Sequence, residues 1–246
     1  LKKFNIIEKN VKIIASAFGF NEIITPIFEL SDLFIKPLGE QSDVVLKEMY
    51  TFNDVNNSSL TLRPEYTTPI IRAAISNNLL EKLPLKLFGI GPMFRRERPQ
   101  KGRFRQFYQM NFEILGTNDT VADAELILLS RSILRKILPD HNFKLHINSL
   151  GDKDTLKKFK LDLSNYFNNY KNDLSEDSQG KINTNPLRIL DSKNSNDIKI
   201  SKDAPIIADL YSSEAKKKFE NIQDLLTRTN VSFIVDSNLV RGLDYY

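Results

Sequence analysis

Apolar and polar side chains alternate along two stretches, Lys86–Glu97 and Arg105–Leu115. Successive side chains of a strand point to opposite faces of a sheet, so this alternation predicts two strands. Between them lie Pro99 and Gly102, residue types that favour a reversal of the chain. The pattern therefore predicts an antiparallel hairpin, around which the rest of the chain is arranged.

The second strand of this hairpin is expected to have one apolar face and one polar face. The side chains expected in a core are Tyr108, Met110, Phe112 and Ile114. The opposite face carries Arg105, Phe107, Gln109, Asn111, Glu113 and Leu115. Arginine and glutamate around an aromatic ring suit an anionic ligand with a flat ring, because guanidinium binds phosphate in a bidentate way. The same pattern also fits a solvated hairpin face with a charged turn.

Apolar residues at helical spacing predict several helices. The longer ones are expected over residues 1–20, from Asp119 or Thr120 to Ile137, over Leu156–Tyr166 and over Ser213–Leu226. A short helix is expected at Leu30–Ile35. Another should begin at Thr67 or Thr68, either of which can cap it, with Pro69 in the first turn.

Shorter runs predict further strands. A strand that carries Pro26 is expected at Ile23–Phe28, and proline in a strand prefers an edge or an interface. The other expected strands are Met49–Phe52 and Ser59–Arg63, which form a second hairpin, together with Phe143–Asn148 and Ser232–Asp236.

Composition narrows the possible functions of this chain. Its 246 residues are 41% hydrophobic and 27% charged, as in an ordinary globular protein, and the net charge is only +4. The absence of cysteine excludes disulfides and thiolate sites within this sequence, and two histidines do not make a histidine-rich metal site. No apolar run approaches the roughly 20 residues of a membrane span. We expect a cytoplasmic protein with no membrane partner and no metal ligands of its own.

Several segments match the signatures of one enzyme family. Phe94–Glu97 (FRRE) matches the Phe-Arg-x-Glu signature of motif 2 in class II aminoacyl-tRNA synthetases, and residues 95–113 resemble the histidyl-tRNA synthetase form of that motif. Further matching segments are Leu60–Thr67, Asn185–Lys193 (NPLRILDSK) and Leu239–Tyr246 (LVRGLDYY). The last of these resembles a histidine-specific motif. The chain thus resembles bacterial-type histidyl-tRNA synthetases over essentially its whole length.

The resemblance implies an α+β fold in which an antiparallel sheet of the class II synthetase type is flanked by helices. Residues 1–151 would form the first part of the catalytic core with motifs 1 and 2. Residues 152–230 would form a mostly helical insertion domain that embraces the tRNA acceptor arm, and residues 231–246 a return strand of the core. The chain begins at Leu1 and ends within a motif, so we expect a fragment truncated at both ends, without motif 3 and the anticodon-binding domain, and inactive alone.

The resemblance also implies a homodimer. The long first helix and the proline-bearing strand after it correspond to motif 1, which builds the dimer interface in class II synthetases. The residue pattern alone equally fits an amphipathic helix packed on its own domain.

The implied reaction is ATP-dependent activation of L-histidine to histidyl-adenylate, followed by transfer to tRNA(His). The implied cofactors are ATP and the Mg²⁺ bound with it, with no protein ligands to the metal. Fixed guanidinium groups at the α-phosphate would lower the barrier, and the candidates are Arg95 and Arg241. Arg95, Glu97 and Phe107 would bind ATP, with Glu97 accepting from the adenine amino group and Phe107 stacking on the ring. Without its neighbouring residues, Arg241 would equally fit an arginine at the end of a strand that forms a salt bridge.

The implied histidine-binding residues are Glu65, Thr67, Gln109, Glu113, Arg241, Tyr245 and Tyr246. Glu65 and Thr67 would hold the α-amino group, although a lone Glu65 also fits a capping acid. Glu113 and Tyr246 would recognise the imidazole of the substrate. An amino acid whose side chain cannot donate a hydrogen bond would leave the fixed carboxylate unpaired, so it would bind less well.

The basic loop at residues 98–103 suits the first base pair and the 5′ phosphate of the tRNA. The implied tRNA-contacting residues are Gln100, Lys101, Arg103 and Arg105. Lysines 216–218 fit a solvated helix face better than a phosphate contact.

Four positions differ from the family pattern. Tyr66 stands where a small residue, usually glycine, follows the motif glutamate. Phe104 and Tyr108 replace the more usual Tyr and His, and Asn111 stands where glycine is common. These differences leave the charged candidates intact.

Two other functions fit parts of the pattern. The synthetase-like regulatory subunit of ATP phosphoribosyltransferase, a non-catalytic protein of histidine biosynthesis, shares the fold but is expected to lose parts of the catalytic set. That set is present here as Glu65, Arg95, Glu97, Gln109, Glu113 and Arg241. The other alternative is an RNA-binding module that uses the basic hairpin and does no chemistry.

Overall fold

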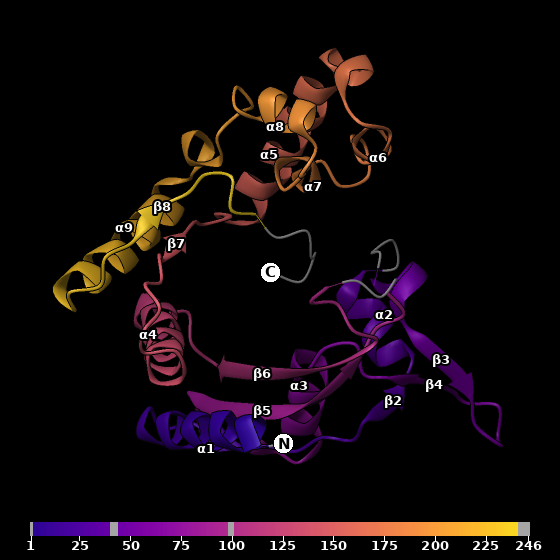
Figure 1. The fold of residues 1–246 in the computed structure, drawn as a ribbon, viewed down its shortest axis with the longest axis vertical. Helices are drawn as coiled ribbons and strands as arrows, with labels where there is room; N and C mark the ends of the chain where they lie inside the picture. Colours follow the sequence, from indigo (N-terminus) through magenta and orange to yellow (C-terminus); the bar gives the residue numbers. More distant parts are fainter. Residues whose placement is uncertain (1, 40–43, 98–100, 241–246) are drawn as a thin grey trace. The chain divides into compact units, whose positions relative to one another are not determined.

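The structure of the chain is a computed structural model that describes residues 2–39, 44–97 and 101–240. Helices and mainly antiparallel strands make up the fold, as expected for the α+β class (Figure 1). Contacts divide the described residues into two compact units. The first unit runs up to residue 141 and the second from residue 142 to residue 240.

The predicted central hairpin is confirmed. Strands β5 (Leu85–Phe94) and β6 (Gln106–Leu115) pair in antiparallel fashion over their full length. The short strand β1 (Asn21–Glu22) runs parallel to β5, which completes a three-stranded sheet in the order β1-β5-β6. Gly102, in the connection between β5 and β6, has a φ of +82°, a backbone conformation that glycine adopts without strain.

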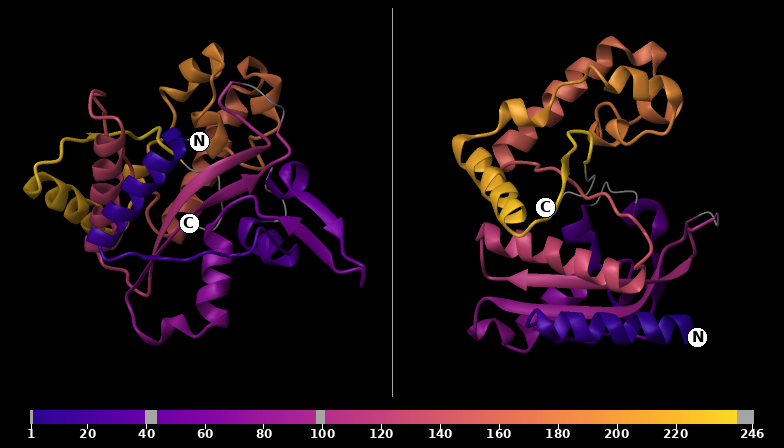
Figure 2. Two further views of the ribbon diagram at one scale, coloured as in Figure 1. Left: turned by 60° about the horizontal axis from the view of Figure 1, so that its bottom comes forward. Right: turned by 60° about the vertical axis from the view of Figure 1, so that its left-hand side comes forward.

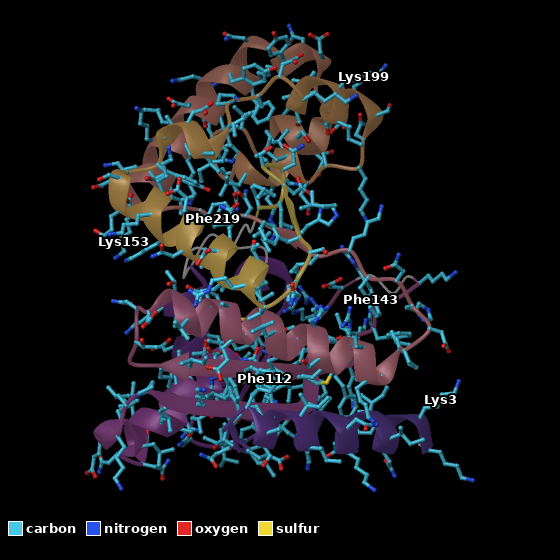
Figure 3. All side chains as sticks on the ribbon, turned by 90° about the vertical axis from the view of Figure 1, so that its left-hand side faces the viewer. Lys3, Phe112, Phe143, Lys153, Lys199 and Phe219 are labelled. Carbon is cyan, nitrogen blue, oxygen red and sulfur yellow. The ribbon has the colours of Figure 1, made fainter. Side chains whose placement is uncertain are left out.

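One face of this sheet packs on helices α1 (Lys2–Ala17) and α4 (Thr120–Ile137). Figure 2 shows α1 running along the hairpin. The buried cluster comprises Val11, Ala15, Phe20, Phe88, Leu129 and Ile133, with Phe112 and Ile114 of β6 packed against it. Phe112 is labelled in Figure 3. The predicted cap of α4 is confirmed, because the Asp119 carboxylate accepts the amide of Val121 at 2.9 Å.

The expectation that the whole apolar side of β6 lies in a core is wrong. Tyr108 is 55% exposed and Met110 is 43% exposed. The buried cluster includes Phe112 and Ile114 at one end of the strand but not these two residues at the other. Tyr108 makes an edge-on ring contact with Phe4 of α1 instead.

The opposite face of the sheet is not uniformly polar. Helix α3 (Thr67–Ser76) packs on it through a second buried cluster. Its members are Tyr66, Ile70, Ala74, Leu87 and Met93, with Phe107 and Leu115 packed against them. The polar side chains of β6 on this face are therefore flanked by buried apolar side chains.

A second three-stranded sheet has the order β2-β4-β3, with antiparallel neighbours. Its strands are β2 (Phe28–Leu30), β3 (Tyr50–Asn53) and β4 (Ser59–Leu62), so the second hairpin is confirmed. Helix α2 (Asp32–Leu38) follows β2, and short helical turns lie at Val44–Glu48 and Leu79–Glu81.

The continuous strand expected at Ile23–Phe28 is wrong. β1 ends at Glu22 and β2 begins at Phe28. Between them the carbonyls of Thr25 and Pro26 accept hydrogen bonds from the Arg63 guanidinium, at 2.9 and 3.3 Å. A side chain thus takes the place of a neighbouring strand for these backbone groups.

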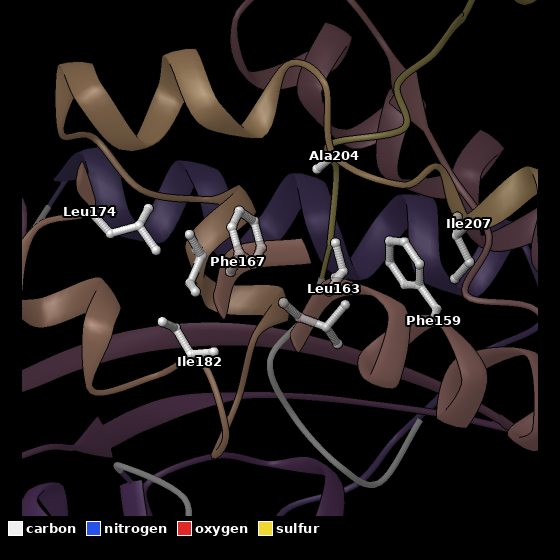
Figure 4. Close-up of a cluster of buried hydrophobic side chains, with 9 residues drawn as sticks. Phe159, Leu163, Phe167, Leu174, Ile182, Ala204 and Ile207 are labelled. Atoms are coloured by element: carbon white, nitrogen blue, oxygen red, sulfur yellow. The ribbon is translucent and has the colours of Figure 1, made fainter. Parts of the chain in front are cut away.

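The second unit is mostly helical. Its helices are α5 (Lys153–Asn169), α6 (Glu176–Gln179), α7 (Leu187–Leu190), α8 (Ser195–Ser201) and α9 (Ser213–Arg228), with short turns at Lys171–Asp173 and Ile207–Leu210. The apolar stripe of α5, made of Phe159, Leu163 and Phe167, lies at the centre of the buried cluster in Figure 4. Strands β7 (His146–Ile147) and β8 (Ile234–Val235) pair in parallel and are shorter than the sequence predicts.

Candidate active site

The polar face of β6 brings several predicted site residues together. Phe107, Gln109, Asn111 and Glu113 are two residues apart in turn, so they project to the same side of the sheet. Gly91 pairs with Gln109 and Gly89 with Asn111, and both glycines leave space on that side. The strand parity that the sequence predicts is therefore confirmed.

The Tyr66 ring and the Arg63 guanidinium fill the space above the two glycines. A β-carbon on Gly89 would lie 2.1 Å from the Tyr66 ring, and one on Gly91 would lie 2.3 Å from the Arg63 guanidinium and 3.2 Å from the ring. Tyr66 is buried, and the Arg63 guanidinium carbon lies 4.3 Å from the centre of its ring. This packing anchors the chain beside Glu65 and Thr67.

Glu65 caps helix α3. Its carboxylate accepts the backbone amides of Thr67 at 2.7 Å and Thr68 at 3.0 Å. These are the first amides of the helix and have no partner within it. The expectation that a threonine side chain caps this helix is wrong, because the preceding glutamate does so. Glu65 is buried, and its carboxylate lies close enough to Glu113 to raise the pKa of that residue.

Glu113 lies in a network with Thr67 and Asn111. The Asn111 amide nitrogen lies 2.6 Å from Glu113 Oε1 and 3.3 Å from Thr67 Oγ1. Burial raises the pKa of the Glu113 carboxyl most, and the nearby Glu65 carboxylate raises it further. Hydrogen bonds from Thr67 and Asn111 act in the opposite direction, but the net shift of the pKa is upward.

Arg95 is held at two points. Its Nε donates to the carbonyl of Pro64 at 3.0 Å, next in sequence to Glu65. Its guanidinium carbon lies 5.2 Å from the centre of the Phe107 ring. A guanidinium group over an aromatic ring is a favourable contact that orients the planar group. Arg95 thus links the Phe107 ring to the backbone of the residue before Glu65.

Glu97 lies just beyond the end of β5. Among the described residues its Oε2 is buried without a hydrogen-bond partner, although Arg103 Nη1 lies 3.3 Å away, within ion-pairing distance. A buried carboxylate oxygen in this state is an acceptor for a ligand N–H. The side chain of Arg103 is 61% exposed, and Lys101 and Arg105 are also exposed.

Four predicted site residues lie outside the described residues. They are Gln100, Arg241, Tyr245 and Tyr246. Conversely, the residue pattern did not predict a site role for Arg63, Tyr66 or Asn111. In the structure, Arg63 and Tyr66 pack against each other beside Glu65, and Asn111 hydrogen-bonds to Glu113. The signal for Tyr66 and Asn111 was their departure from the family pattern. Arg63 gave no signal beyond its place in a matching segment.

Among the described residues, no three His, Cys, Asp or Glu side chains lie together as a metal-binding group. No helix of the described part of the chain is long and apolar enough to cross a bilayer.

A sequence model of the histidyl-tRNA synthetases matches residues 2–165 of this chain. That match covers more than half of the sequence. The chain belongs to the histidyl-tRNA synthetase family.

Curated members of the family align with nearly the whole chain. A histidine–tRNA ligase from Wolbachia pipientis wMel is 50% identical over 244 residues, covering 99% of this chain. One from Ehrlichia ruminantium, strain Welgevonden, is 47% identical over 246 residues, covering all of it. In each case the chain spans 59% of the relative's own length.

Solved structures agree with this family and fold. The apo histidyl-tRNA synthetase of S. aureus superposes with a TM-score of 0.74 at 32% identity, over all of this chain and 55% of that one. A protein from Bacillus halodurans, described as an ATP phosphoribosyltransferase regulatory subunit/histidyl-tRNA synthetase, superposes with a TM-score of 0.64 over all of this chain and 66% of that one. At 21% identity the second match shows the fold alone.

Proposed function

We propose that this chain carries part of the catalytic machinery of a class II histidine–tRNA ligase, which activates L-histidine with ATP and transfers it to tRNA(His). The observation that carries this proposal is the polar side of the hairpin. There Arg95 lies over the Phe107 ring, and Glu113 interacts with Thr67 and Glu65. A guanidinium group and carboxylates presented by one hairpin and the helix packed on it suit a substrate that has both phosphate and ammonium groups.

In the first step, a carboxylate oxygen of histidine attacks the α-phosphorus of ATP, and pyrophosphate leaves. Arg95 stabilises the charge on the non-bridging α-phosphate oxygens, because its guanidinium stays charged and is already oriented by Pro64 and Phe107. In the second step, a hydroxyl of the tRNA 3′ end attacks the acyl carbon and AMP leaves. Mg²⁺ bound with ATP would neutralise phosphate charge, without a ligand from this chain.

The adenine end of ATP is assigned to Glu97 and Phe107. The unsatisfied Oε2 of Glu97 supports its role as acceptor for the adenine amino group. Adenine stacking on Phe107 would use the aromatic surface that Arg95 also contacts.

The histidine end is assigned to Glu65, Thr67, Gln109 and Glu113. The Glu65 carboxylate lies at the first turn of α3, where it would pair with the ammonium group. Glu113 would accept the imidazole N–H. Arg241, Tyr245 and Tyr246 keep their predicted roles in this pocket, and Gln100 in the tRNA-contacting loop with Lys101, Arg103 and Arg105. These assignments stay predictions.

The division into core and insertion domain also stays a prediction, with residues 1–151, 152–230 and 231–246 as its parts. The mostly helical second unit supports an insertion domain. A groove of about 490 Å³ on this unit is lined in part by Lys157, Lys158 and Lys160 of α5 and by Thr184. Clustered lysines beside a groove suit the phosphate backbone of the tRNA acceptor arm.

We further propose a homodimer built on the β2-β4-β3 sheet and the segment before it. Large apolar side chains are exposed there, including Ile24 at 81%, Phe28 at 51% and Leu30 at 59%. Such a patch fits a protein interface. Sedimentation of the full-length product of this reading frame should show a dimer, and Phe28→Asp should shift it to monomers. A wild-type monomer would remove the dimer from the proposal.

The regulatory-subunit alternative is not favoured, since the relatives at about 50% identity are named histidine–tRNA ligases. We place the reaction in the cytoplasm, where translation consumes charged tRNA.

The test of the proposal is histidine-dependent ATP–pyrophosphate exchange by the full-length product of this reading frame. Exchange with histidine, and with no other amino acid, is expected. A folded protein that binds ATP but shows no exchange with histidine would contradict the proposal.

A further inference from the structure

Asn111 forms a closed network with the two proposed histidine contacts on either side of it. Its amide nitrogen lies within hydrogen-bonding distance of Glu113 Oε1, at 2.6 Å, and of Thr67 Oγ1, at 3.3 Å. A side-chain amide has two N–H groups, so it can serve both acceptors at once. Asn111 thereby joins strand β6 to the first residue of helix α3.

The direction of each hydrogen bond follows from the chemistry of the groups. An ionised carboxylate only accepts, so the NH₂ end of the Asn111 amide must face Glu113. Thr67 also hydrogen-bonds to Glu113, so its hydroxyl proton points to that carboxylate. The Thr67 oxygen then accepts from Asn111 and keeps one lone pair for a further donor, such as a substrate ammonium group.

The electrostatics of the site oppose an ionised Glu113. Burial and the charge of Glu65 both raise the pKa of the Glu113 carboxyl. Hydrogen bonds from Thr67 and Asn111 lower this pKa. Loss of either donor would therefore favour the protonated acid, which is a weaker acceptor for an imidazole N–H.

The location of Asn111 is unusual for its residue type. Asparagine is depleted in strands, yet this one stands in the middle of a ten-residue strand. It pairs with Gly89, where the Tyr66 ring occupies the space left by the missing β-carbon. The position thus lacks a facing side chain on β5, and the Asn111 amide turns to Glu113 and Thr67 instead.

We propose that Asn111 is a positioning residue for histidine recognition, which holds Glu113 as an ionised acceptor for the imidazole and ties it to Thr67 at the α-amino end. This proposal rests on the proposed function. Its consequence is that the two ends of the amino acid are recognised by one connected network rather than by two independent contacts.

The test compares variants of the full-length product in histidine-dependent pyrophosphate exchange. Asn111→Ala removes both hydrogen bonds, and Asn111→Asp places a second acceptor against Glu113. Met110→Ala is the matched control, because Met110 lies on the same strand but points to the opposite face. For each protein, kcat and the KM for histidine and for ATP are measured over the whole pH range in which the protein stays folded, starting near the ordinary glutamate pKa of about 4.3.

Asn111→Ala should raise the KM for histidine about tenfold, because a hydrogen bond to a charged group is lost, and leave the KM for ATP within about twofold. The acid limb of kcat/KM for histidine should move to higher pH, because Glu113 loses a donor that lowers its pKa. Protonation of free histidine affects the pH profile of every variant equally, so the difference between two profiles reports on the enzyme. Asn111→Asp should be the weaker enzyme of the two at alkaline pH, where both carboxyls repel each other.

Each outcome decides one point. An unchanged histidine KM and acid limb in Asn111→Ala, with an active wild type, would overturn the positioning role alone. Equal rises in both KM values with an unmoved acid limb would reduce Asn111 to a packing residue and also overturn it. If the folded wild type neither binds nor activates histidine, the proposed function fails, and the role of Asn111 fails with it.

Discussion

The Tyr66 ring occupies the space that a side chain on Gly89 would need, since a β-carbon there would lie 2.1 Å from Tyr66 Cε1. Tyr66 lies between Glu65 and Thr67 in sequence, so this contact with β5 also positions both of its neighbours. Gly89 is the strand partner of Asn111. A glycine with no functional group therefore supports two sides of the candidate site.

Gly89→Ala should lower the free energy of unfolding by about 2 to 3 kcal/mol, because the added methyl group overlaps a buried ring. In a Tyr66→Ala background the same change should cost under about 1 kcal/mol, since residues in contact are not additive. Urea unfolding of the four proteins measures this coupling. Gly180→Ala is the control, because its β-carbon would meet its nearest neighbour at an ordinary 3.8 Å. Equal costs of Gly89→Ala in the two backgrounds would contradict the contact.

Arg95→Ala should reduce histidine-dependent pyrophosphate exchange at least tenfold, a loss of about 1.4 kcal/mol or more in the barrier. Arg95→Lys should recover little of this, because an ammonium group can neither stack on Phe107 as a plane nor bind phosphate in a bidentate way. Arg135→Ala, at an exposed arginine near the end of α4, is the control. A wild-type rate in Arg95→Ala would remove Arg95 from the mechanism.

Substitutions at Glu65 should separate its two roles. Glu65→Gln keeps one oxygen that can accept a helix amide, but it turns an NH₂ group toward the other amide and loses the charge that would pair with the substrate ammonium group. It should raise the KM for histidine about tenfold or more and lower stability by about 1 to 2 kcal/mol. Glu65→Ala should also lower stability by about 1 to 2 kcal/mol. Kinetics and thermal unfolding of both variants provide the test, and an unchanged histidine KM in Glu65→Gln would leave Glu65 as a cap alone.

Asp197 should stabilise the second unit in a pH-dependent way. Its fully buried carboxylate accepts the hydroxyls of Ser175, Ser178 and Ser192 at 2.6 to 2.7 Å and the amide of Ser175 at 2.9 Å. Burial alone would raise its pKa, but these donors outweigh burial and lower the pKa. The stabilisation is therefore present above the unfolded-state pKa of about 3.9 and is lost as the pH falls through the lower folded-state pKa.

Asp197→Asn should accordingly lower the free energy of unfolding at neutral pH by about 2 to 4 kcal/mol, because its NH₂ group faces donors. The difference from wild type should shrink in acid. Denaturant unfolding at several pH values measures this, with the exposed Asp209→Asn as control. A difference that grows in acid would contradict the sign.

Lysines beside the groove on α5 should act in the tRNA step alone. The double variant Lys157→Ala/Lys158→Ala should raise the KM for tRNA about fivefold to tenfold and weaken its salt dependence, while pyrophosphate exchange stays unchanged. The matched control is Lys216→Ala/Lys217→Ala, which removes two exposed neighbouring lysines of α9 that do not line the groove. Equal effects of the two double variants would mean that only total charge matters.

The sequence predicts well what local patterns control. Alternation identified the hairpin and the shared face of Phe107, Gln109 and Glu113, and helical periodicity identified α1, α4, α5 and α9. It did not predict that Tyr108 and Met110 are exposed. Period-two alternation tells which side chains share a face, but it does not tell how far along the strand a packing helix reaches.

Contacts between residues distant in sequence could not be predicted from the pattern of apolar and polar residues either. The Arg95 guanidinium binds the carbonyl of Pro64, and the Arg63 guanidinium binds carbonyls at Thr25 and Pro26, where a strand was expected. Each of these depends on how separate elements meet. The cap of α3 had a local signal, but two threonines at the expected position competed with the glutamate that provides it.

The Asp152 side chain caps α5 and also accepts a hydrogen bond from the Ser212 hydroxyl at 2.6 Å. Ser212 in turn caps α9. The pKa of Asp152 is lowered to about 2, chiefly by Ser212, so this link stays ionised at any pH in a living cell. Two residues 60 positions apart thus meet at the base of the segment they enclose. Because the ends of that segment already lie together, an insertion or deletion at one of its exposed turns need not separate the chain on either side.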